Sequence, residues 1–85
     1  MNTLSHLDRM LDPVTQMMPV EFAQKLVDFR ADESMQQRID YLRNRANQGT
    51  LTPEEDSEYK DVIDAIDLIS LLQAKARRVL SRHTN

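Results

Sequence analysis

The sequence predicts an all-α protein: a small helical bundle of two short N-terminal helices, a third helix and a long C-terminal helix. Three observations lead to this class. The 85 residues include one glycine and three prolines, fewer turn residues than a β-rich fold requires. Apolar residues recur three and four positions apart along most of the chain, which is the period of an α-helix. After Pro53 no glycine or proline interrupts the pattern.

Length and composition indicate a single domain over residues 1–85, with helices expected at about 3–11, 19–29, 33–48 and 53–82. The chain has no cysteine, which excludes disulfides, thiol catalysis and cysteine-ligated metal sites. No segment approaches the roughly 20 apolar residues of a membrane span, and the N-terminus lacks a basic start followed by an apolar run. We therefore expect a cytoplasmic protein with no membrane contact.

The first helix is expected over residues 3–11, where Leu4, Leu7 and Leu11 repeat at helical spacing. Pro13 is expected to end it, because proline disfavours helical geometry in the residue before it. Residues 14–18 are then expected to form a linker.

The second helix is expected over residues 19–29, with Pro19 in its first turn. A helix this short is not stable by itself and should dock on the long C-terminal helix. We expect Phe22 and Phe29 to be its main buried side chains.

The third helix is expected over residues 33–48, with Asp32 or Ser34 as its N-cap and Gly49 as a left-handed C-terminal cap. A narrow apolar stripe along it predicts one packed face and otherwise solvated sides; its members are Met35, Ile39, Leu42 and Ala46.

The strongest local signal is the start of the fourth helix. Thr52 is the expected N-cap, Pro53 occupies the first helical position, and Glu55 lies three residues after Thr52, which is the spacing of a capping box. The third and fourth helices should therefore form a hairpin with a short connection.

The fourth helix is apolar on most sides between Ile63 and Leu72, so we expect this middle section to be the core on which the other helices pack. A straight helix over residues 53–82 would be about 45 Å long, whereas a small domain is about 30 Å across. One end is therefore expected to project, bend or be covered by another chain.

No residue pattern indicates an enzyme, a cofactor site or a metal site. A phosphate-binding loop requires several glycines, and a serine nucleophile requires a positioned base, whereas the only histidines are His6 and His83 near the chain ends. The Glu-x-x-His pairs of di-metal bundles and the glycine-centred calcium loop are also missing from the sequence.

Carboxylates crowd the first half of the fourth helix and form one candidate partner-binding surface. Two interpretations stay open: a solvated face that complements the helix dipole, and a contact surface for a basic protein. The candidate contacts are Glu54, Glu58, Asp61, Asp64 and Asp67.

Cations gather in the second half of the same helix. They suit the negative end of the helix dipole, and they are also the candidate contacts for nucleic acid: Lys75, Arg77, Arg78 and Arg82. The net charge of −3 and the lack of nearby aromatic side chains oppose the nucleic-acid interpretation.

The charge asymmetry of the fourth helix predicts a homodimer. Residues 53–67 hold seven acids and one base, and residues 68–85 hold four bases and no acid. Two antiparallel copies of helix 53–82 would place opposite charges side by side along an apolar seam.

The stretch Leu42–Glu55, followed by Tyr59 and by Leu71–Arg77, resembles small bacterial all-α proteins with a GTLTPEE…Y…LLQAKAR pattern. Such proteins are encoded beside nucleases of the His-Asn-His type. The resemblance implies an antitoxin- or immunity-like protein that binds and neutralises a basic nuclease toxin. Two alternatives stay open, a small DNA-binding transcriptional regulator and a structural or assembly subunit that acts through its long helix.

Overall fold

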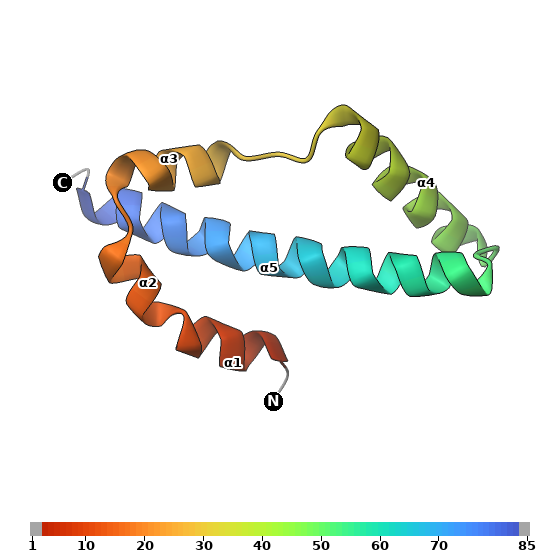
Figure 1. Ribbon diagram of the computed structural model, residues 1–85, viewed down its shortest axis with the longest axis horizontal. Coiled ribbons are helices and arrows are strands. Elements are labelled where there is room, and N and C mark those ends of the chain that lie inside the picture. The colour runs from red at the N-terminus through yellow and green to blue at the C-terminus, as the bar shows by residue number, and fades with distance from the viewer. Residues whose placement is uncertain (1–2, 84–85) are drawn as a thin grey trace. The chain divides into compact units, whose positions relative to one another are not determined.

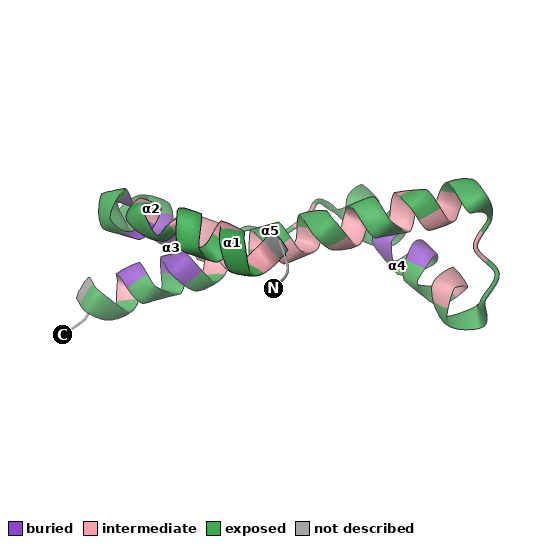
Figure 2. Ribbon diagram, turned by 90° about the horizontal axis from the view of Figure 1, so that it is seen from below, coloured by how far each residue is buried: buried purple, intermediate pink, exposed green. Residues whose placement is uncertain are grey.

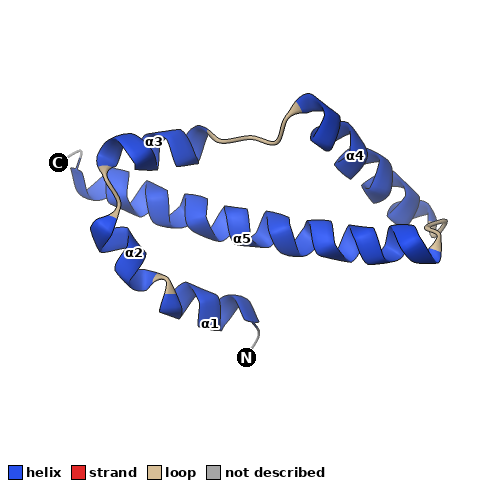
Figure 3. Cartoon of the chain, viewed as in Figure 1, coloured by secondary structure: helices blue, strands red, loops and turns tan. Residues whose placement is uncertain are grey.

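The computed structural model describes residues 3–83, which form five α-helices and no strand (Figures 1 and 3). The predicted all-α class is confirmed. No helix among these residues combines the length and apolar character needed to cross a membrane. The helices are α1 (Thr3–Met10), α2 (Asp12–Met17), α3 (Val20–Asp28), α4 (Glu33–Gln48) and α5 (Pro53–His83).

The chain divides into two compact units. The first contains the chain up to Phe29 together with the chain from Asp67 onward, and the second contains Arg30–Ile66. The long helix α5 therefore contributes its C-terminal part to the first unit and its N-terminal part to the second.

The first unit has a small apolar core in which α3 packs against the C-terminal part of α5. Its buried members are Met18, Ala23, Ala76 and Val79, and Ala23 and Ala76 are fully covered. Figure 2 colours the buried positions of the ribbon purple. The Gln73 side-chain amide donates to the carbonyl oxygens of Leu26 (3.1 Å) and Phe29 (2.9 Å). Gln73 thus satisfies carbonyl groups at the C-terminal end of α3.

The expectation that Phe22 and Phe29 are the main buried residues of their helix is wrong. Their exposed fractions are 55% and 49%, respectively. Phe22 lies in α3 and Phe29 is the residue that caps its C-terminal end, whereas Ala23 and the partly buried Leu26 and Val27 supply the packed side of the helix. The short side chain of Ala23, rather than the larger phenylalanines, faces the core.

The expected linker over residues 14–18 is also wrong in part, because residues 12–17 form α2. Pro13 lies in the first turn of this helix, where its missing N–H leaves no intrahelical hydrogen bond unmade. Proline therefore separates α1 from α2 but does not prevent a new helix from starting at the same place.

The second unit confirms the predicted cap residues. The Asp32 side chain accepts a hydrogen bond from the Met35 N–H (2.8 Å), and Gly49 adopts a left-handed conformation (φ 69°). At the start of α5 the Glu55 N–H donates to Thr52 Oγ1 (3.1 Å), and the Thr52 N–H donates to Glu55 Oε1 (3.0 Å). This reciprocal pair is the predicted capping box.

The expected core between Ile63 and Leu72 is not where α5 is buried. Every apolar side chain in that section is partly or largely exposed, and Leu68 is 38% exposed. The buried positions of α5 are Lys75, Ala76 and Val79, in the part that belongs to the first unit. In the second unit α4 supplies the buried residues, Ile39 and Leu42.

Candidate protein interface

The hairpin of α4 and α5 is joined by a polar network that sequence reasoning did not identify. Arg38 donates two hydrogen bonds to Glu58, from Nε to Oε2 (2.9 Å) and from an Nη atom to Oε1 (2.7 Å). The Tyr41 hydroxyl donates to Glu55 Oε2 (2.9 Å). Arg38 and Tyr41 are three residues apart on α4, and Glu55 and Glu58 are three residues apart on α5. This matched spacing on the two sides of the turn was the signal available in the sequence.

Arg45 closes the network at the turn. One Nη atom donates to the Thr50 carbonyl (2.8 Å) and lies 3.7 Å from Glu55 Oε1. The guanidinium groups of Arg38 and Arg45 lie 5.1 Å and 5.7 Å from the centre of the Tyr41 ring. These distances are within the range of cation–π attraction, so Tyr41 contacts both arginines.

The network keeps its carboxylates ionised. The hydrogen bonds from Arg38 lower the pKa of Glu58, and the same contact raises the pKa of Arg38. The pKa of Glu55 is lowered first by the hydrogen bond from the Thr52 backbone and then by the Tyr41 hydroxyl. Glu55 and Glu58 are therefore committed to the hairpin itself.

The five predicted acidic contacts are placed in different environments. Glu58 is engaged by Arg38, and Asp67 is half-buried and belongs to the first unit. Glu54, Asp61 and Asp64 are exposed on the α5 part of the second unit. No cation within residues 3–83 forms an ion pair with any of these three. They are the carboxylates available to another molecule.

The second unit also carries the excess negative charge of the protein. Residues 30–66 contain nine acids and five bases. Four of these bases already pair with carboxylates of the same unit, in Arg38–Glu58, Arg43–Asp40, Arg45–Glu55 and Lys60–Asp56. The unit therefore presents a negative surface to its surroundings.

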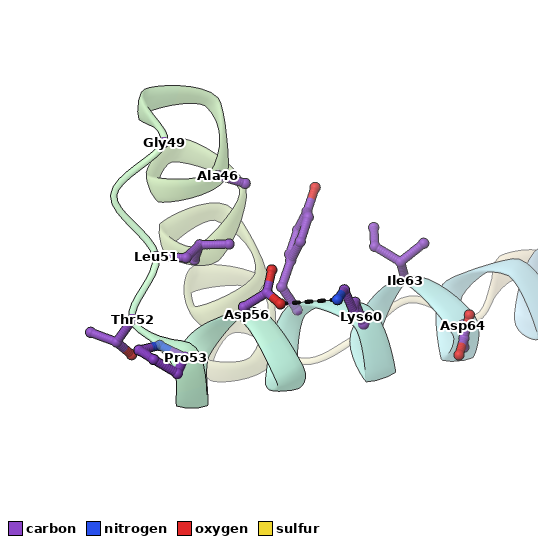
Figure 4. Close-up of a pocket in the computed structure, with 10 residues that line it drawn as sticks. Ala46, Gly49, Leu51, Thr52, Pro53, Asp56, Lys60, Ile63 and Asp64 are labelled. Carbon is purple, nitrogen blue, oxygen red and sulfur yellow. Dashed lines mark ion pairs between the residues drawn. The ribbon is translucent and has the colours of Figure 1, made fainter.

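An open hollow of about 730 Å³ lies beside the turn of the hairpin (Figure 4). Figure 4 shows Ala46 and Leu51 extending toward the side on which Ile63 stands out from α5, with the Asp56–Lys60 ion pair (3.0 Å) along the edge. Tyr59 also lines it. The lining combines apolar side chains with the charged groups of Asp56, Lys60 and Asp64, which suits a protein side chain better than a reaction.

The predicted nucleic-acid contacts are divided by the structure. Lys75 is only 1% exposed, and its Nζ donates to Asp8 Oδ1 and Asp12 Oδ1, both at 2.9 Å. Burial acts to lower the pKa of Lys75, but the two carboxylates outweigh it and the pKa is raised. The hydrogen bond from Lys75 lowers the pKa of Asp12. Lys75 thus connects α1 and α2 to α5, and the exposed cations are Arg77, Arg78 and Arg82.

Across the described part of the chain, no group of three or more His, Asp or Glu side chains is arranged to hold a metal ion. Comparison with protein-family models, with curated proteins and with solved structures gave no match.

Proposed function

We propose that this chain is a non-enzymatic protein-binding module whose acidic hairpin binds a basic protein. The observation that supports the proposal is the set of exposed carboxylates Glu54, Asp61 and Asp64, which lack a cation partner within residues 3–83 and lie in a unit of excess negative charge. Such a surface attracts a basic protein over long range and accelerates its encounter.

The partner that we propose is a nuclease toxin, which the chain neutralises as an antitoxin or immunity protein does. A nuclease must present cations to the phosphates of its substrate. Carboxylates on a rigid helix can occupy those cations and exclude the nucleic acid. The nuclease class comes from the sequence resemblance, and the negative hairpin surface supplies the chemistry that such a role requires.

An inhibition assay tests this function. The purified chain is added to a His-Asn-His nuclease of the kind that the resemblance implies as its partner, and cleavage of plasmid DNA is followed as the ratio of the two proteins increases. We expect cleavage to stop near a fixed stoichiometric ratio. Undiminished cleavage at a large excess of the chain would contradict the proposed role.

A mobility-shift assay with the isolated chain at physiological salt separates the runner-up. A DNA-binding regulator requires sequence-specific binding by the isolated protein, with Arg77, Arg78 and Arg82 as the contacts. We expect no specific shift. A specific complex that is lost on replacement of these arginines would favour the regulator over the inhibitor.

A further inference from the structure

The hollow beside the hairpin turn is apolar surface that the second unit does not cover with its own chain. Leu51, Tyr59 and Ile63 line it and are each only half-buried. Each helix of a pair covers only one face of the other. Apolar side chains that lie next to this contact face therefore remain exposed to solvent. Exposed apolar surface that is concave and rimmed by polar groups is typical of protein interaction sites.

The spacing of the lining suits a helical occupant. Tyr59 and Ile63 are four residues apart on α5, so they lie one above the other along one side of the helix. Leu51 in the turn and Ala46 at the end of α4 supply the opposite wall. An amphipathic helix placed along such a groove inserts apolar residues at three- and four-residue steps.

The charges around the hollow select the polar face of that occupant. Asp56, Lys60 and Asp64 follow one another at four-residue steps along α5 and line the hollow, and Lys60 is already paired with Asp56. Asp64 has no cation partner within residues 3–83. A helix that carries lysine or arginine beside its apolar residues would pair with Asp64.

We propose that the hollow, with Asp64 in its lining, binds a basic amphipathic helix of the partner protein. An apolar side chain of that helix occupies the space between Leu51 and Ile63, and a cation of the helix contacts Asp64. This inference depends on the proposed function, because it names the part of the basic partner that the acidic hairpin recognises. The hairpin of a second copy carries the same excess of negative charge and is repelled.

The test uses three synthetic helical peptides as probes of the full chain. The first combines leucine on one face with lysine on the other, the second replaces lysine by glutamate, and the third replaces leucine by serine. Methyl NMR spectra report which side chains of the protein are contacted. We expect only the leucine–lysine peptide to bind, with the largest shifts at Leu51 and Ile63.

Ala46→Leu supplies a variant that fills the hollow without removing any packing. We expect it to lower the affinity for the leucine–lysine peptide by about tenfold or more, with the unfolding midpoint of the protein unchanged or raised. Phe22→Ala is the matched control, because it removes half-exposed apolar surface from the first unit and should leave the affinity unchanged.

Four outcomes would overturn the inference: no binding by the leucine–lysine peptide; equal binding by the serine–lysine peptide; the largest shifts at Val20 and Leu26 of the first unit; or undiminished affinity in Ala46→Leu. Concentration-dependent shifts of Leu51 and Ile63 without peptide would assign the hollow to a second copy and overturn it as well. None of these results requires the nuclease inhibition to fail, so the inference and the proposed function are tested separately.

Discussion

The two units of this protein use ion pairs in opposite ways. In the first, the ammonium of Lys75 is 1% exposed and is held by two carboxylates whose side chains are about half exposed. In the second, both side chains of the Arg38–Glu58 pair are substantially exposed, at 46% and 39%. A buried cation cannot exchange its partners for water, whereas exposed groups can. The contacts of Lys75 in the first unit are therefore structural, whereas the second unit has exposed charged groups that a partner can contact.

The largest expected effect comes from removing the carboxylates around the buried cation. In the double variant Asp8→Asn/Asp12→Asn the Lys75 ammonium loses both counter-charges, and a buried charge left in this way costs about 3 kcal/mol. The free energy of unfolding, measured with urea and circular dichroism, should fall accordingly. Lys75→Met is the matched control and should change the free energy of unfolding by less than about 1 kcal/mol, because it leaves no buried charge without a partner. Equal losses in both variants would contradict this asymmetry.

The pH dependence of stability should also depend on this site. The pKa of Asp12 is lowered on folding, so its contribution is complete above about pH 3.9 and is lost as the pH falls through the lowered value. The pKa of Lys75 is raised, so its contribution is complete below about pH 10.4 and is lost as the pH rises through the raised value.

Urea unfolding of the wild-type chain and of Lys75→Met over this range should reveal both limits. The difference in the free energy of unfolding between the two proteins should be constant near neutral pH and change at both extremes of pH. A difference that varies mainly between pH 6 and pH 8 would show that neither group is responsible.

A smaller effect is expected at the start of α5. Thr52→Ala removes the side-chain acceptor of the capping box and should lower the free energy of unfolding by about 1 kcal/mol. It should also weaken the hydrogen bonding between Thr52 and Glu55. An NMR titration would detect this change as a rise in the pKa of the Glu55 carboxyl. Ser57→Ala, at an exposed position of the same helix, is the control and should leave both quantities nearly unchanged.

The smallest effect is expected at the exposed pair of the second unit. Arg38→Gln breaks the two hydrogen bonds to Glu58, but water can solvate the carboxylate in their place. We expect the unfolding midpoint to stay within experimental error and the pKa of Glu58 to move up toward its ordinary value. A loss of stability as large as that of Asp8→Asn/Asp12→Asn would contradict the distinction between the two units.

Local features of the fold were predictable because their causes lie within a few residues. The caps at Asp32, Gly49 and Thr52 depend on neighbouring groups in the chain, and all three are confirmed. The candidate acidic surface was predictable in its position on α5, but the engagement of Glu58 by Arg38 required the geometry of the hairpin.

Features that depend on distant residues were not predictable in the same way. Lys75 reads as one of several surface cations until Asp8 and Asp12, more than sixty positions earlier, are brought beside it. Likewise, periodicity identifies the apolar sides of α3 and α5 but does not say which side is covered. The buried side of α3 is that of Ala23, and the buried section of α5 contains Ala76 and Val79.

The most direct test of the central claim is the rate at which the chain associates with the nuclease that we propose as its partner, measured as salt is raised. Replacement of the two aspartates in Asp61→Asn/Asp64→Asn should slow association about tenfold or more at low salt and flatten its salt dependence. Glu21→Gln/Asp28→Asn removes the same charge from the first unit and should have little effect. Equal slowing by both double variants would show that net charge alone acts and would contradict a binding surface on the hairpin.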